Sequence, residues 1–275
     1  MKSGHGRVAL VTGATSGFGK EIASSLCKEG FTVYGTGRSA APSVREDGVR
    51  MLAMDVTDPE SVRNAVKAVI SESGRIDLLV NNAGMGIAGA VELADEDEMR
   101  LQIETNFFGM CRVCSCVLPH MRERHTGHIV NISSIAGIFA VPYQGFYSAS
   151  KSAIEAYSEA LELETRKFGI RVSVIEPGDF RTGFTASRRV SAATAESGDY
   201  GPEFKHVLAG IEKDEQGGAD PAMLARDVCR LARSRRPRFR VLTGGFVQTS
   251  FARVSPLLPH SLKRYLLTLF YGMHR

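Results

Sequence analysis

Tyr147 and Lys151 have side-chain types and a spacing that suit acid–base chemistry. They stand four positions apart in the run YSASK, and on a helix this spacing places both side chains on one face. A nearby ammonium group favours the phenolate form, so it makes the phenol a stronger acid at neutral pH. Such a phenol can give a proton to the alkoxide that forms when hydride reaches a carbonyl carbon. Because the spacing is common in helices, its meaning depends on the elements that position the pair.

The amino-terminal segment has the order strand, glycine turn and helix. Residues 7–12 (RVALVT) are an apolar run that suits a strand covered on both faces, and residues 20–29 have the apolar spacing of a helix. The turn between them, TGATSGFG, contains Gly13, Gly17 and Gly19. In this order the first glycine permits a sharp turn, the second lets backbone approach a pyrophosphate, and the third lets the helix pack closely on the sheet. The segment therefore predicts a dinucleotide site, the alternative being a glycine turn that only connects two elements.

The residue after the second predicted strand indicates which dinucleotide binds. That strand covers residues 31–36, and a dinucleotide fold usually places an acidic residue after it, against the adenosine ribose. Here Gly37 and Arg38 occupy those positions. A guanidinium group binds a 2′-phosphate through charge-assisted hydrogen bonds, whereas a carboxylate repels it. Arg38 therefore favours NADP(H) over NAD(H), unless it is a plain surface residue.

Two features follow the third predicted strand, at residues 50–54. Asp55 and Val56 lie at its carboxyl end, where the adenine of a dinucleotide would rest. Asp58 suits a helix N-cap with Pro59 in the first helical position, and an amphipathic pattern follows. The order of strand, turn and helix seen at the amino terminus is thus repeated.

Strands and helices alternate through the rest of the chain. The further strands are predicted at residues 76–80, 128–133, 171–175 and 238–242. This alternation specifies parallel pairing through right-handed crossovers. A chain of 275 residues can fold as one such unit. The fold class is therefore α/β, a doubly wound parallel sheet of seven strands (a Rossmann fold), in a single domain covering residues 1–275.

Polar residues stand near the carboxyl ends of these strands, where an open parallel sheet binds ligands. Ser134 follows the fifth strand, and Asn82 lies in the turn NNAG after the fourth. The Asn82 amide can bind backbone and brace neighbouring loops, alongside any cofactor contact. Asn106 lies inside a long helical pattern at residues 95–124. Its amide either loosens the local helical hydrogen bonds and holds a water, or is an ordinary polar residue.

The composition argues against several classes of protein. A hydrophobic content of 43% and a charged content of 23% are ordinary for a globular protein, and no apolar run approaches the roughly 20 residues that cross a bilayer. The net charge of +4 is mild and aromatic residues do not interleave with basic ones, so we expect no nucleic-acid partner. An odd number of cysteines, five, and no secretory signal before the first strand favour a reduced, cytoplasmic location.

Three of the cysteines lie close together, at Cys111, Cys114 and Cys116. Their spacing is compatible with metal ligands, but no second cluster of Cys or His accompanies them. We therefore expect no metal site and interpret the three thiols as small buried residues on a packed helix.

Together these motifs resemble those of the short-chain dehydrogenase/reductase family, in its single-domain form. The motifs TGATSGFG, DVTD, NNAG, a helical Asn, ISSIAG, YSASK and PGDFRT follow the family's order over residues 7–242. The resemblance implies a catalytic tetrad of Asn106, Ser134, Tyr147 and Lys151. Tyr147 would then be the general acid/base, and Lys151 would lower its pKa and bind the nicotinamide ribose. Ser134 would orient and polarise the substrate carbonyl, and Asn106 would hold a water that relays protons.

The resemblance also implies which residues bind NADP(H). Besides Tyr147 and Lys151 these are Gly13, Ser16, Gly17, Phe18, Gly19, Arg38, Asp55, Val56, Asn82, Pro177, Gly178, Phe180 and Thr182. The first five would line the pyrophosphate, Arg38 the 2′-phosphate, the next two the adenine and Asn82 the ribose near the nicotinamide. The last four would brace the nicotinamide and its carboxamide. Family members that prefer NADP(H) often carry a basic residue inside the glycine turn, which this chain lacks, so Arg38 alone bears that preference.

The resulting hypothesis is a cytoplasmic oxidoreductase, a carbonyl reductase that transfers hydride between NADP(H) and a ketone or secondary alcohol. The resemblance implies a homodimer or homotetramer formed through the helices that carry Asn106 and Tyr147. An alternative is a catalytically silent NADP(H)-binding sensor or scaffold, but such a protein needs no matched acid and activator. Family members that epimerise or dehydrate usually have a larger substrate domain after the sixth strand than this chain can supply.

Three segments near the carboxyl terminus indicate the substrate end. Residues 183–218 lack clear periodicity and follow the PG turn, so we expect a substrate lid there. Residues 257–273 are apolar on one face, with Pro259 opening a helix; this helix covers the pocket, meets a partner subunit or lies on a bilayer, and we favour the first two. An apolar tail beside the pocket would suit a lipophilic ketone or alcohol. The arginines in residues 233–240 either are a solvated surface or attract an anionic substrate or membrane.

Overall fold

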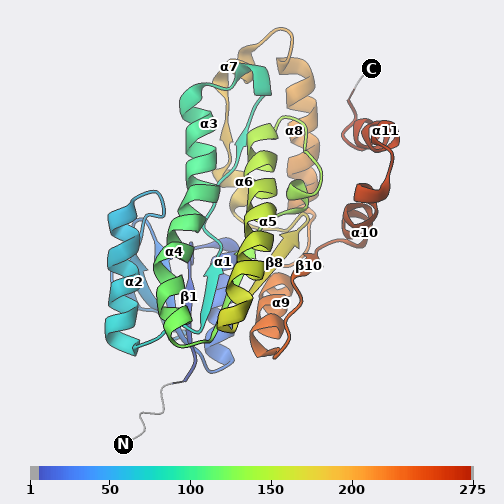
Figure 1. Ribbon diagram of the computed structural model, residues 1–275. Helices are drawn as coiled ribbons and strands as arrows, with labels where there is room; N and C mark the ends of the chain where they lie inside the picture. The colour runs from blue at the N-terminus through green and yellow to red at the C-terminus, as the bar shows by residue number, and fades with distance from the viewer. Residues whose placement is uncertain (1–5, 274–275) are drawn as a thin grey trace, which may run out of the picture.

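The computed structural model describes residues 6–273 and contains one large sheet with helices on both faces (Figure 1). Seven strands run parallel in the spatial order β10-β8-β7-β5-β1-β2-β4. In chain order they are β1 (Val8–Val11), β2 (Thr32–Gly37), β4 (Arg50–Ala53), β5 (Leu78–Asn81), β7 (Gly127–Ile132), β8 (Ile170–Pro177) and β10 (Arg240–Thr243). The predicted fold class and the parallel pairing are confirmed.

Three short strands were not predicted. β3 (Ser43–Val44) pairs antiparallel with β4 and adds an eighth strand at the edge of the sheet. β6 (Ile87–Ala88) and β9 (Arg189–Val190) form a separate two-stranded parallel sheet. Each has two residues, which is too short for an apolar alternation to appear in the sequence.

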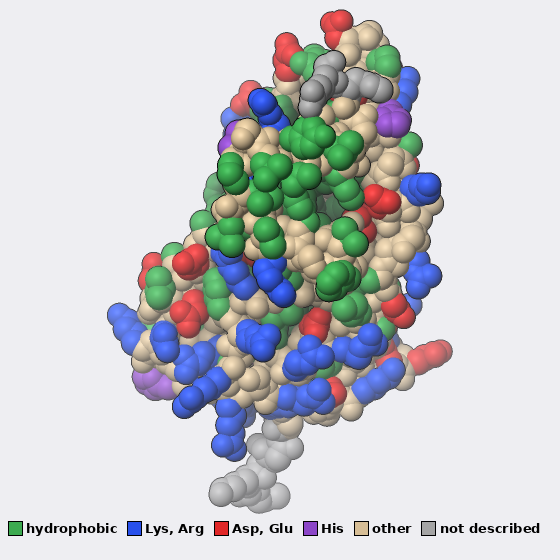
Figure 2. Space-filling view, turned by 90° about the vertical axis from the view of Figure 1, so that its right-hand side faces the viewer, with side chains coloured by type: hydrophobic (Ala, Val, Ile, Leu, Met, Phe, Trp, Pro, Cys, Tyr) green, Lys and Arg blue, Asp and Glu red, His purple; other side chains and the backbone are tan. Residues whose placement is uncertain are grey.

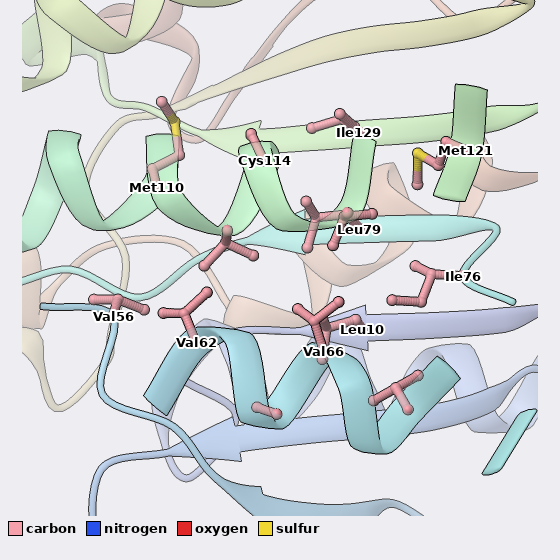
Figure 3. Close-up of a cluster of buried hydrophobic side chains, with 14 of the residues drawn as sticks. Leu10, Val56, Val62, Val66, Ile76, Leu79, Met110, Cys114, Met121 and Ile129 are labelled. Carbon is pink, nitrogen blue, oxygen red and sulfur yellow. The ribbon is translucent and has the colours of Figure 1, made fainter. Parts of the chain in front are cut away.

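Two helices cover one face of the sheet, α1 (Gly17–Lys28) and α9 (Pro221–Arg233), and they pack against each other. α2 (Pro59–Ser73), α4 (Gly109–Glu123) and α5 (Gly145–Thr165) cover the other face. Figure 3 shows the apolar core on this second side, where side chains of α2 and α4 meet those of the strands. All four residues of β1 are fully buried, as expected for a central strand covered on both faces.

The predicted start of α2 is confirmed in detail. The Asp58 side chain accepts a hydrogen bond of 2.9 Å from the Glu60 amide, and Pro59 occupies the first helical turn. Gly74 ends the helix in the left-handed conformation, with φ of 69°. These local signals in the sequence mark where the helix begins and ends.

The long helical pattern predicted at residues 95–124 is confirmed, with one irregular turn. It consists of α3 (Glu96–Ile103), the π-helical turn η2 (Glu104–Phe108) and α4, without a break. Asn106 lies inside the π-helical turn. Such turns insert an extra residue into the helical ladder, so the local loosening that was one of the two alternatives for Asn106 is present.

The segment at residues 183–218 is more regular than expected. It contains α6 (Phe184–Ser187), α7 (Ala192–Glu196) and α8 (Gly201–Gln216). Phe204, Val207 and Ile211 are buried along one side of α8. Their spacing is helical, so the expectation of a segment without periodicity is wrong; three apolar positions among many polar ones are a weak signal.

The chain after β10 forms an outer wall. α10 (Phe246–Val254), η5 (Ser255–Leu257) and α11 (His260–Phe270) lie at the side of the molecule, next to α8 and α9 in Figure 1. The predicted helix in residues 257–273 is thus present, with Pro259 as its N-cap. The remaining elements are the short helical turns η1 (Val91–Leu93), η3 (Ile135–Gly137) and η4 (Arg166–Phe168). Within the described residues no helix has the length and hydropathy of a membrane span.

Candidate active site

A cavity of about 860 Å³ lies at the carboxyl ends of the parallel strands. Its walls come from the glycine turn after β1, from the ends of β2, β4, β5, β7 and β8, and from α5, α8, α10 and α11. This is the edge at which open parallel sheets bind ligands. Of the predicted site residues, all line the cavity except Gly19 and Asn106, which lie directly behind its wall.

The glycine turn has the conformation that its sequence predicts. Gly13 and Gly17 have φ of 66° and 49°, a region that favours glycine. A side-chain carbon at Gly19 would overlap the Gly13 carbonyl oxygen, so only glycine lets α1 start this close to the turn. At Gly17, in contrast, the space on the cavity side holds only Thr182 at ordinary contact distance. The first backbone amides of α1 therefore face the cavity at a helix N-terminus, which suits a phosphate group.

Asn82 braces this turn. Its side-chain amide donates to the carbonyl oxygens of Thr12, at 2.9 Å, and Gly13, at 3.2 Å. In return the Thr12 hydroxyl accepts hydrogen bonds of 2.9 Å from the amides of Asn82 and Ala83. The predicted bracing is confirmed. Thr12 was missed as a site residue because its position in an apolar strand gave no sign that its hydroxyl would tie two loops together.

The outer part of the cavity is bounded by Arg38, Asp55 and Val56. Arg38 is exposed at the end of β2, so its guanidinium can reach a ligand phosphate from the solvent side. The Asp55 carboxylate accepts bonds from the amide and hydroxyl of Thr57, at 2.9 and 2.7 Å, which holds the loop after β4 in place. The three residues thus form one wall beyond the glycine turn.

Tyr147 and Ser134 meet on the inner part of the cavity. Tyr147 lies in the first turn of α5, and Ser134 lies between β7 and η3, where its hydroxyl accepts a bond of 3.1 Å from the Ala136 amide. Burial raises the pKa of Tyr147 to about 12, and hydrogen bonding to Ser134 opposes that rise. The phenol therefore keeps its proton at neutral pH.

Lys151 lies one turn after Tyr147, with its nitrogen 5.7 Å from the centre of the Tyr147 ring. Its ammonium donates a hydrogen bond of 2.9 Å to the Ile132 carbonyl at the end of β7. Burial lowers the pKa of Lys151 to about 8, and the Glu155 carboxylate opposes this fall. Burial is the largest influence on the pKa of Tyr147 and raises it, whereas the sequence led us to expect a pKa lowered by Lys151.

Three hydrogen bonds hold the side-chain amide of Asn106 behind the cavity. Its nitrogen donates to the Met85 carbonyl at 3.0 Å and to the Ser150 hydroxyl at 3.1 Å, and its oxygen accepts from the Met85 amide at 2.9 Å. These bonds tie the π-helical turn both to α5 and to the loop after β5. Asn106 therefore fixes the position of the helix that carries Tyr147 and Lys151 relative to the strand ends.

The segment after β8 closes the cavity next to Tyr147. The ring of Phe180 packs edge-on against Phe18 of the glycine turn, with ring centres 5.0 Å apart. The Gly178 amide donates to the Thr243 carbonyl at 2.9 Å, and Thr182 accepts from the Phe184 amide at 3.2 Å. Pro177 ends β8 and lines the same wall. Phe180 and Thr182 thus lie against the glycine turn, and all four residues predicted in this segment line the cavity.

The far end of the cavity is mainly apolar. The side chains that contribute to it from outside the sheet are Phe139, Phe184, Ile211, Phe251, Leu266, Leu267, Leu269 and Phe270. The acidic groups Asp179, Asp214 and Glu215 also line it. Burial raises the pKa of Asp179 to about 6, and a hydrogen bond from Gln248 opposes that rise. None of these residues was predicted individually, since they come together only when α8, α10 and α11 pack over the strand ends.

A buried carboxyl pair lies behind Lys151 and was also missed. Glu155 follows Lys151 by one turn of α5, and Glu176 lies near the end of β8; both are almost fully buried. Arg240 of β10 is 3.4 Å from Glu155 and 4.0 Å from Glu176. Burial raises the pKa of both carboxyl groups, that of Glu176 to about 8. The sequence did not predict this cluster, because Glu155, Glu176 and Arg240 lie far apart in the chain.

Among the described residues no group of three or more His, Cys, Asp and Glu side chains could hold a metal ion. Cys114 is buried in the core next to the Asn81 amide, while Cys111 and Cys116 pack at its border. The cavity has instead the parts that a nicotinamide dinucleotide requires: an open glycine cradle at a helix N-terminus, an exposed arginine at the end of β2 and a neutral phenol at the inner end.

The chain belongs to the short chain dehydrogenase family, whose family model matches residues 7–192. It is therefore an oxidoreductase of that family. A 3-ketodihydrosphingosine reductase from Bacteroides thetaiotaomicron is 49% identical over 267 residues, which cover 97% of this chain and 98% of the relative. Retinol dehydrogenase 8 from Bos taurus is 32% identical over 252 residues, 85% of this chain and 80% of the relative.

Solved structures agree with this assignment. A short-chain dehydrogenase from Streptomyces avermitilis has a TM-score of 0.81 and 33% identity, covering 97% of this chain and 98% of its own. Other solved proteins of similar fold hold NADP or a derivative of it in some cases and NAD in others. These neighbours therefore all bind a nicotinamide dinucleotide, but they differ in whether it is NAD or NADP.

Proposed function

We propose that the chain is an NADP(H)-dependent reductase of a lipophilic, long-chain ketone of the 3-ketodihydrosphingosine kind. The observation that carries the proposal is the continuous cavity, which is lined by Tyr147, by the glycine turn and by apolar side chains such as Phe251 and Leu267. The similarity to a 3-ketodihydrosphingosine reductase over 97% of the chain supports a ketone with a long apolar chain.

In the proposed reaction the chain's residues would hold NADP(H), whose nicotinamide would supply the hydride for the carbonyl carbon. Tyr147 donates its proton to the carbonyl oxygen; a phenol with a pKa of about 12 is a proton donor at neutral pH. Ser134, hydrogen-bonded to Tyr147, orients the same oxygen. The Lys151 ammonium binds the nicotinamide ribose and stabilises the phenolate that remains. Asn106 holds α5 in register, and a water near it would return a proton through Lys151.

Arg38 is the residue that supports NADP(H) over NAD(H). It lies at the end of β2 on the cavity wall, where the 2′-phosphate of the adenosine ribose would be. Replacing Arg38 by Ser should lower kcat/KM for NADPH by about tenfold or more, because a charge-assisted phosphate contact is lost, and should leave that for NADH nearly unchanged. Steady-state rates with both nucleotides test this; equal use of NADPH and NADH by the unchanged protein would contradict it.

The test of the reaction is NADPH oxidation with 3-ketodihydrosphingosine in mixed micelles, compared with a short water-soluble ketone. We expect a higher kcat/KM for the long-chain ketone. Tyr147→Phe should lower kcat by roughly 10³-fold while NADPH still binds, measured by nucleotide fluorescence, since only the phenol proton is removed. Turnover that survives in Tyr147→Phe would contradict the role of the phenol. No turnover of any ketone, with NADPH bound normally, would favour the silent sensor or scaffold.

We also propose a homodimer or homotetramer formed through α4 and α5. Exposed apolar side chains on these neighbouring elements support it, with Phe108 at 48% exposure just before α4 and Leu163 at 68% on α5. We further propose that the protein is cytoplasmic, because its odd number of cysteines favours a reducing compartment.

A further inference from the structure

The outer wall formed by α10, η5 and α11 exposes large apolar side chains around the mouth of the cavity. We call this surface the C-terminal face and define it by Phe246, Val247, Leu257, Leu262, Leu269 and Phe270. Phe246 and Leu257 are 85% and 83% exposed. In Figure 2 hydrophobic side chains gather on this side of the molecule around a hollow. A patch of this kind on a folded chain usually marks an interaction surface.

The C-terminal face is continuous with the cavity. Val247, Leu269 and Phe270 are exposed to solvent and also line the cavity, so they form its lip. Other residues of α11 point inward: Leu267 packs against the cluster of Ile135 and Phe139. The helix α11 is therefore apolar both toward the cavity and toward the outside. A helix that only covers a pocket needs one apolar side.

The segment that forms this face carries charged side chains of one sign, while the acidic Asp179, Asp214 and Glu215 line the cavity behind it. Residues 242–273 contain no Asp or Glu, while Arg253, Lys263 and Arg264 are basic. Arg253 and Arg264 are exposed, and Lys263 donates to the Ile138 carbonyl at 3.5 Å. Figure 2 shows a band of mostly Lys and Arg side chains below the apolar patch, with a few Asp and Glu side chains among them and beside the hollow. Exposed apolar groups flanked by basic ones match a bilayer surface that carries anionic headgroups.

We infer that the C-terminal face docks on an anionic lipid bilayer, with the mouth of the cavity turned toward the lipid. Docking would bury Phe246, Leu257 and Leu262 among the acyl chains near the headgroups while the basic side chains contact phosphates. A second copy of the chain fits this face less well, because a two-fold contact would bring the same acid-free basic segment against itself. The inference rests on the proposed function in one respect only: a lipophilic ketone would enter the cavity directly from the bilayer.

Co-sedimentation of the full chain with vesicles tests the docking without any substrate. We expect binding to vesicles of phosphatidylcholine with phosphatidylglycerol, weaker binding to phosphatidylcholine alone, and partial release by added salt. The triple variant Phe246→Ser, Leu257→Ser, Leu262→Ser should bind at least about tenfold more weakly, because three apolar side chains no longer enter the lipid. Val44→Ser is the matched control, since Val44 is 70% exposed on β3 at the opposite edge of the sheet.

The same variants are assayed for NADPH oxidation with a short water-soluble ketone. None of the three replaced residues lines the cavity, so this activity should be unchanged, which also shows that the variant is folded. The inference is overturned if the unchanged protein does not bind anionic vesicles, if it binds neutral ones equally, or if the triple variant binds as well as Val44→Ser. Gel filtration without lipid decides the remaining case: a smaller assembly for the triple variant would assign the face to a second copy. A protein that binds vesicles but reduces no ketone would contradict the proposed function alone.

Discussion

The charge of Lys151 depends strongly on its surroundings. Its burial favours the neutral amine, and the nearby Glu155 carboxylate favours the ammonium, leaving a pKa of about 8. Glu155 is in turn held by Arg240 and faces Glu176 across the end of β8. A line of interacting ionisable groups therefore runs from Arg240 on the edge strand β10 to Lys151, one helical turn after Tyr147.

Replacing Glu155 by Gln should move the alkaline limb of the pH profile of kcat/KM to lower pH. The carboxylate raises the pKa of Lys151, so its removal lowers that pKa below about 8 and less ammonium remains in alkaline solution. We expect roughly threefold lower kcat/KM at pH 8.5 and little change at pH 6.5. Arg240 and Glu176 remain in the variant.

Glu159→Gln is the control, since Glu159 also lies near Arg240 but is largely exposed. If Glu155→Gln lost activity equally at every pH, the cause would be a packing defect and not a change in the pKa of Lys151.

Among the elements, the close approach of α1 to the glycine turn decides whether the nucleotide cradle exists. Gly19→Ala would push its new methyl group against the Gly13 carbonyl and the Asn82 amide. We expect a loss of about 2 kcal/mol in the free energy of unfolding and at least about tenfold weaker NADPH binding, measured by urea titration and nucleotide fluorescence.

Gly210→Ala gives the matched control. Gly210 lies within α8 with open space where a side-chain carbon would be, so alanine there should leave stability equal or raise it by about 0.5–1 kcal/mol. Equal free energies of unfolding for the Gly19 and Gly210 variants would show that α1 can move away from the turn without loss of stability.

The helix α11 forms the apolar end of the cavity, so it should discriminate between long and short substrates. Leu267 lines the cavity and packs near Phe139 and Ile135. Leu267→Ser should raise KM for the long-chain ketone about tenfold, because about 1.5 kcal/mol or more of apolar contact is lost. KM for a short ketone should change little. A parallel rise for both substrates would mean that α11 supports the site and does not contact the chain of the substrate.

For the molecule as a whole, two faces have separate roles in the proposals. α4 and α5 would face a second copy, while the C-terminal face would meet lipid. Leu163→Glu places a charge on α5 at a position that is 68% exposed, so it should not unfold the chain. We expect it to shift the protein to a monomer in gel filtration with light scattering, because burying an unpaired carboxylate disfavours the contact.

Val44→Glu serves as the control for oligomeric state, since it adds the same charge to an exposed position outside α4 and α5. An unchanged assembly in Leu163→Glu would remove α5 from the proposed interface. Vesicle binding should persist in Leu163→Glu, since the two faces use different residues.

The sequence by itself determined the parallel strands, the capped α2, the glycine turn and the edge at which the site lies. These depend on local rules: apolar periodicity, capping side chains and the conformations open to glycine. Short-range spacing also placed Tyr147 and Lys151 on one helix face.

Only the tertiary structure decided the electrostatics of the site and the shape of its far end. Burial raises the pKa of Tyr147, opposite to the expected direction, and the packing of α5, β8 and β10 brings Glu155, Glu176 and Arg240 together. The two-residue strands and α8 were likewise missed, because their apolar positions are few and gain meaning through distant partners. Desolvation and contact between segments far apart in the chain depend on the packed arrangement, and no local pattern records them.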